Sequence, residues 1–146
     1  MIRRNLLDSN VLIALTSREH PQYSSAQRWF DSLADGEEWG MCPLSESGYV
    51  RIVTNPASGP IAQSFFQAGA ILKDLAQRPG YRYWPIYQSW ADLTAPFATR
   101  IFGHQRVTDA FLLGLAIRED GVLVTFDRGL KYLAGQEFRR NLLVLQ

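Results

Sequence analysis

Apolar residues along the chain follow two patterns, short apolar runs and longer stretches with helical spacing. The short runs predict strands at residues 2–7, 39–43, 81–86, 122–126 and 142–145. The stretches with apolar residues three or four positions apart predict helices at residues 11–15, 22–34, 44–55, 61–78, 87–102 (broken near Pro96) and 107–120. Because these strands and helices alternate, we expect an α/β domain whose mostly parallel sheet is covered on both faces.

Individual segments refine this expectation. Residues 107–120 are apolar nearly all round, which predicts a buried helix. Residues 61–78 form the clearest amphipathic helix, and residues 122–126 are the β-branched run expected of a central parallel strand. Ser45 is the expected N-cap of the helix over residues 44–55.

Length and composition limit the classes of protein. The 146 residues, 47% hydrophobic and 20% charged, predict one globular domain over residues 1–146. No apolar run is long enough to span a membrane, and Asp8, Ser9 and Asn10 interrupt the N-terminal apolar stretch, so no signal peptide is expected. The single cysteine, Cys42, cannot form an internal disulfide, which indicates a reducing cytoplasm. A net charge of +1 gives no overall attraction to nucleic acid.

Four acidic residues lie at the ends of predicted elements. Asp8 and Asp127 follow predicted strands, and Glu46 and Asp109 lie near the starts of predicted helices. Each alone is explained by a helix start or a turn. In a parallel sheet, however, these positions gather at one edge, and crowded carboxylates repel one another unless a cation joins them. Since Mg²⁺ and Mn²⁺ prefer carboxylate and water oxygens, the four acids predict a divalent-metal site.

Four segments resemble the motifs of PIN-domain ribonucleases, and most closely those of the VapC toxins of bacterial toxin–antitoxin pairs. They are LLDSNVLIAL (6–15), LSESGYVRIVTNP (44–56), VTDAFLLGLAIREDG (107–121) and LVTFDRGL (123–130). The resemblance covers nearly the whole chain in order. It implies an α/β/α sandwich with a central, mostly parallel sheet, and RNA cleavage that depends on Mg²⁺ or Mn²⁺.

The resemblance also assigns residues. The family's catalytic and metal-binding acids match Asp8, Glu46, Asp109 and Asp127, and its supporting polar positions match Asn10 and Thr125. We expect the metal to activate a water that attacks the phosphorus of RNA, leaving 5′-phosphate and 3′-hydroxyl ends. The resemblance further implies a small antitoxin as partner and a homodimer, for which the helix over residues 61–78 is a candidate surface. No membrane partner is expected.

Residues that select the RNA are harder to assign. Arg51, Arg106 and Arg128 lie near the acidic motifs, where they could hold phosphates or face solvent. The sequence departs most from the family over residues 79–106. There, YRYW at residues 81–84 could either stack on bases or pack in the core.

Three other functions are compatible with parts of the sequence. A degenerate PIN domain would bind RNA or protein without cleaving. An Asp-based phosphotransfer domain would place a second acid two residues after Asp8, where Asn10 stands. A metal-free ribonuclease could use His20 and His104, although nothing around them supports this. Cys42 has no neighbouring base and is interpreted as a buried structural thiol. Mn²⁺-dependent RNA cleavage would separate these classes.

Overall fold

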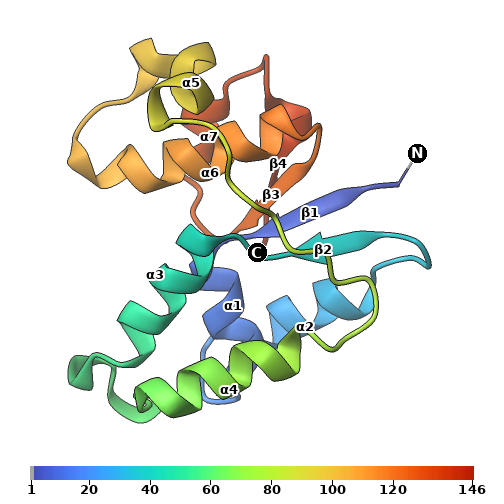
Figure 1. Ribbon diagram of the computed structural model, residues 1–146, viewed down its shortest axis with the longest axis vertical. Coiled ribbons are helices and arrows are strands. Elements are labelled where there is room, and N and C mark those ends of the chain that lie inside the picture. The colour runs from blue at the N-terminus through green and yellow to red at the C-terminus, as the bar shows by residue number, and fades with distance from the viewer. Residues whose placement is uncertain (1) are drawn as a thin grey trace.

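The computed structural model describes residues 2–146, so residue 1 of the predicted domain lies outside the described residues. A four-stranded sheet, in the order β2-β1-β3-β4, lies at its centre (Figure 1). The strands are β1 (Arg4–Leu7), β2 (Glu38–Gly40), β3 (Val122–Thr125) and β4 (Leu142–Val144). Every neighbouring pair is parallel, as predicted.

The register of the two central strands explains the two-sided core. Leu6 pairs with Leu123, and Leu7 pairs with Val124. Because successive residues of a strand point to opposite faces, these two pairs enter different apolar cores. All four side chains are fully buried, which agrees with a sheet covered on both sides.

Helices cover both faces, which confirms the predicted α/β/α sandwich (Figure 1). One layer holds α1 (Ser9–Thr16), α2 (Tyr23–Asp31), α3 (Pro43–Val53) and α4 (Phe65–Leu75). The other holds α5 (Trp90–Thr94), α6 (Val107–Arg118) and α7 (Leu130–Ala134). Short 3₁₀ helices, η1 (Pro56–Ile61), η2 (Ala95–Arg100), η3 (His104–Arg106) and η4 (Arg139–Asn141), connect them. Among the described helices, none combines the length and the apolar character needed to cross a membrane.

The strongest patterns predicted their elements well. The helix α6 is buried as expected, and the predicted interruption near Pro96 separates α5 from η2. The helix α4 is shorter than the predicted 61–78, because Ser64 and Gln67 form a capping box that begins it only at Phe65.

Two local predictions were wrong. Residues 81–86 do not form a strand; only Tyr81 bridges to Trp39 of β2. The segment still donates from Arg82 N and Trp84 N to carbonyls at residues 39 and 41. The pairing stops there, because its partner segment after Met41 turns into α3 at Pro43. Similarly, Cys42 rather than Ser45 caps α3. Ser45 is the third residue after this N-cap, and its Oγ accepts a hydrogen bond from Cys42 N at 3.0 Å.

Candidate active site

The carboxyl ends of β1 and β3 lie side by side, and this juxtaposition places the first acidic residue. Asp8 follows β1, and its N–H donates to the Val124 carbonyl at 3.0 Å. Its Oδ1 accepts from Ser9 N at 2.7 Å, so the carboxylate also caps α1. Strand pairing and helix capping thus fix the Asp8 side chain from both directions.

Thr125 connects Asp8 to the rest of the site. Its Oγ1 donates to Asp8 Oδ2 at 2.8 Å and accepts from Asn10 Nδ2 and Asp127 N, both at 3.1 Å. Asn10 Oδ1 in turn accepts from Phe126 N at 3.1 Å. The two residues expected to support the site therefore form one hydrogen-bonded network with two of its acids.

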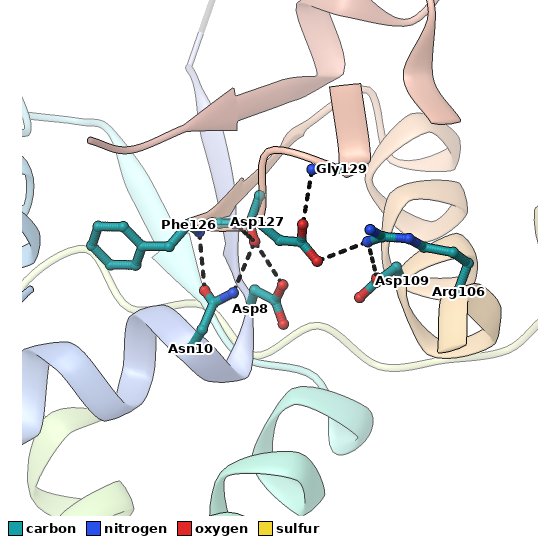
Figure 2. Close-up of polar contacts among 8 residues, drawn as sticks. Asp8, Asn10, Arg106, Asp109, Phe126, Asp127 and Gly129 are labelled. Carbon is teal, nitrogen blue, oxygen red and sulfur yellow. Dashed lines mark hydrogen bonds and ion pairs between the residues drawn. The ribbon is translucent and has the colours of Figure 1, made fainter. Parts of the chain in front are cut away.

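Arg106 joins the remaining aspartate to this network. Its Nη1 lies 2.9 Å from Asp109 Oδ2 and 2.7 Å from Asp127 Oδ2, so one guanidinium nitrogen bridges two carboxylates (Figure 2). The other oxygen of Asp127 accepts from Gly129 N at 2.8 Å. In this arrangement, Arg106 is a counter-ion of the acids rather than a free phosphate ligand.

Burial makes ionisation of these acids unfavourable. The Asp8 side chain is almost fully enclosed, and burial raises its pKa from 3.8 to about 6. The hydrogen bond from Thr125 opposes this rise, while the negative charge of Asp109 adds to it. Burial also raises the pKa of Asp109, against the lowering effect of Arg106. Desolvation, more than the expected repulsion between carboxylates, therefore dominates the electrostatics.

The structure places Glu46 beside this group rather than within it. Glu46 is in the first turn of α3, next to Ser45, whose carbonyl accepts from Ser9 Oγ at 2.8 Å. Gly48 permits this approach, because a Cβ there would lie 2.3 Å from that hydroxyl oxygen. Across residues 2–146, however, no hydrogen bond or ion pair joins Glu46 to an aspartate. Glu46 instead influences Tyr81: burial of Tyr81 and, to a smaller extent, the negative charge of Glu46 raise the pKa of Tyr81 to about 12.

The donor chemistry of the three aspartates suits a hard cation. All their free donors are carboxylate oxygens, and a cationic nitrogen already occupies the position between Asp109 and Asp127. With Arg106 in that position, the described residues hold no group of three or more His, Cys, Asp or Glu side chains close enough to bind a metal. A cation bound between Asp109 and Asp127 would therefore have to displace the guanidinium of Arg106.

Sequence reasoning identified Arg106 but missed its role as the bridge between two acids. The spacing of three residues between Arg106 and Asp109 is the available signal, since such pairs face each other on a helical turn. Its contact with Asp127, 21 residues away, has no comparable local signal.

The other candidate substrate residues differ in accessibility. Arg51 and Arg128 are exposed, and Arg128 directly follows Asp127. Within the YRYW segment, Trp84 is buried in the core, whereas the Tyr83 side chain is 48% exposed. The core interpretation therefore holds for Trp84, and Tyr83 remains available to a ligand.

The histidines and the cysteine considered as alternative catalytic residues form no hydrogen bond or ion pair with the acids among the described residues. His20 Nδ1 accepts from Gln22 N in the turn before α2, and His104 is exposed at the start of η3. Cys42 is buried, and burial raises the pKa of its thiol, in agreement with a structural role.

Comparison with known proteins identifies the class. The model of the PIN domain family matches residues 6–136. Ribonuclease VapC38 of Mycobacterium tuberculosis is 40% identical over 131 residues, covering 90% of each chain. Ribonuclease VapC44 of the same species is 32% identical, covering 90% of this chain and 91% of its own. The chain belongs to the PIN domain family and, within it, to the VapC ribonucleases.

Solved structures agree with this fold. VapBC2 from Rickettsia felis, bound to a DNA fragment from its promoter, aligns with a TM-score of 0.65 at 15% identity, covering 98% of this chain and 99% of that chain. VapBC-1 from nontypeable Haemophilus influenzae aligns with a TM-score of 0.61 at 17% identity, covering 97% of each. At such low identity, these structures support the fold of the chain.

Proposed function

We propose that this protein is an endoribonuclease toxin that cleaves RNA with the help of Mg²⁺ or Mn²⁺. The observation that carries the proposal is the convergence of Asp8, Asp109 and Asp127 at the carboxyl edge of the sheet in a member of the VapC family. The relatives named ribonucleases support nuclease activity. Asp8 and Asp109 are the main metal ligands in this proposal, with Asp127 and Glu46 completing the set directly or through water.

Each residue then has a separate task. Thr125 and Asn10 position Asp8 relative to the Asp127 loop, because their hydrogen bonds connect the Asp8 carboxylate to Asp127 N. Arg106 neutralises Asp109 and Asp127, and its guanidinium would be able to bind a phosphate oxygen of RNA if a cation took over these two acids. A bound divalent cation supplies a water of lowered pKa and stabilises negative charge on the phosphate.

The proposal is tested by expression followed by sequencing of RNA ends that carry a 5′-phosphate. Wild-type protein should arrest growth and generate new ends. Asp8→Asn and Asp109→Asn should generate none, because each loses a carboxylate ligand. Asp35→Asn is the matched control, since Asp35 is exposed and belongs to another part of the fold.

Activity of purified protein should disappear in excess EDTA and return with Mn²⁺. Full cleavage in EDTA would refute metal dependence. Binding of RNA without new ends in any assay would instead favour the degenerate, non-catalytic PIN domain.

We further propose a small antitoxin as partner, supported by the fold shared with VapBC toxin–antitoxin structures. If a small gene adjoins the one for this protein, co-expression with that gene should relieve the growth arrest and yield a complex on purification. Persistent arrest despite expression of that gene would contradict the assignment of this partner.

A homodimer through α4 is also proposed. Ala68, Leu72 and Leu75 bury one face of this helix, while Phe65 and Phe66 are 75% and 86% exposed. Light scattering should give a dimer for the wild type and a monomer for Phe66→Ser. An unchanged mass would exclude this helix as the interface.

A further inference from the structure

A cavity of about 800 Å³ lies at the β4 edge of the sheet, between α7, η2 and η4. We call it the α7–β4 groove. Its lining includes Arg100, Lys131, Tyr132, Arg139 and Val144. Its lining contains three cationic side chains and no acidic one, although the net charge of the whole protein is only +1.

The positive charge of the groove is largely uncompensated. Arg100 approaches Glu137 at 3.9 Å, but the Glu137 side chain is 68% exposed and the pair is therefore weak. In the part of the chain that the structure describes, neither Lys131 nor Arg139 has an ion-pair partner. A cavity near β2 is different, since four acids and two arginines line it. The balance of charge thus distinguishes the α7–β4 groove from the cavity near β2.

The groove adjoins the acidic site. Val144, in its wall, pairs in register with Thr125, the residue that donates to Asp8. The next residue after β4 donates from its N–H to the Thr125 carbonyl at 2.8 Å. Lys131 lies in α7, the helix that follows the Asp127 loop. The groove wall and the strand that ends beside Asp8 are therefore neighbours in the sheet.

We infer that the α7–β4 groove binds the backbone of single-stranded RNA next to the cleavage position. Lys131 and Arg139 bind phosphates, and Tyr132, whose side chain is 69% exposed, offers its ring to a base. A positive groove with an exposed aromatic ring is the combination that binds single strands with little dependence on sequence. This inference rests on the proposed function, because RNA is its ligand.

The test measures RNA binding without cleavage, in the Asp8→Asn background. Anisotropy of a labelled single strand of about 16 nucleotides is recorded from about 50 to 200 mM NaCl. Replacing Lys131 and Arg139 together with glutamine should weaken binding roughly tenfold or more, and should reduce the slope of log affinity against log salt by about 1.4, or about 0.7 for each lost phosphate contact.

Arg118 and Arg140 provide a control with the same change of charge. Both are exposed, and Arg140 lines a different cavity beside Asp120 and Gly121. Their double replacement by glutamine should leave the slope close to that of the Asp8→Asn parent. Circular dichroism checks folding, and exchanging Lys131 to arginine and Arg139 to lysine should preserve binding because it keeps both charges.

Equal losses of RNA affinity in the groove variant and in the control variant would overturn the inference. So would unchanged RNA binding combined with loss of a protein partner, which would assign the groove to that partner. If the wild type generates new RNA ends but the groove variant binds RNA normally, the inference fails and the proposed nuclease stands. If the wild type generates no ends, the proposed function itself fails.

Discussion

Replacing Asp8 with asparagine should change how the stability of the protein depends on pH. The Asp8 carboxyl is 7% exposed, and burial raises its pKa from 3.8 to about 6. The folded protein therefore holds this proton more tightly than the unfolded chain does. Without metal, the contribution of Asp8 to stability should fall as the pH rises from about 4 to about 6, and its full penalty should remain above that range.

The size of this effect follows from the two pKa values. The difference between 3.8 and about 6 corresponds to about 3 kcal/mol, at about 1.4 kcal/mol for each pH unit. Asparagine has nearly the same shape and can still accept from Ser9 N at the start of α1, but it does not ionise. The wild type should therefore lose about 3 kcal/mol relative to Asp8→Asn across this pH range.

Urea unfolding in EDTA at about pH 4 and about pH 7.5 measures this difference, since most other titrating groups contribute equally to both proteins. Asp35→Asn should follow the wild type. Mn²⁺ at 100 times its dissociation constant should then stabilise the wild type by about 2.7 kcal/mol at the higher pH, with a smaller effect on Asp8→Asn. Parallel pH profiles for wild type and Asp8→Asn would refute the argument, because they would mean that Asp8 is well solvated.

Four further substitutions, one of them a control, test individual contacts. Arg106→Gln should bind Mn²⁺ several-fold more tightly by calorimetry, because the cation no longer displaces two ion pairs at 2.9 and 2.7 Å; weaker binding would exclude this competition. Thr125→Val should lower the free energy of unfolding by about 1–3 kcal/mol, because Asp8 loses a hydrogen bond. It should also raise the pKa of Asp8 above about 6, as measured by NMR titration. An unchanged pKa of Asp8 would contradict the role of the Thr125 hydroxyl. Gly114→Ala should destabilise the fold by about 1–3 kcal/mol or more, because its Cβ would lie 2.3 Å from a backbone oxygen of α5. The control Gly69→Ala lies in open space on α4 and should stabilise the fold by up to about 1 kcal/mol. Equal melting temperatures of the two variants would argue against close packing at Gly114.

The sequence alone was sufficient for the architecture and for expecting Asp8 and Asp127 at one edge of the sheet. Apolar periodicity predicted α6 and the central strand β3, and the positions of Asp8 and Asp127 after apolar runs placed them at one edge. These inferences succeed because a helix or strand that is buried needs apolar residues at a regular spacing along its own sequence. They succeed also because the carboxyl ends of parallel strands lie at the same edge of the sheet.

The tertiary structure decided which charges meet. Arg106 bridges two acids while Glu46 stands beside the group, and Lys131 and Arg139 share a groove with no acid in its lining. A periodic pattern cannot encode the contact between Arg106 and Asp127 or the shared groove, since both depend on how α6, α7 and β4 pack together. The raised pKa of Asp8 has the same origin, because desolvation depends on every element packed around a carboxylate and not on the residues next to it in the chain.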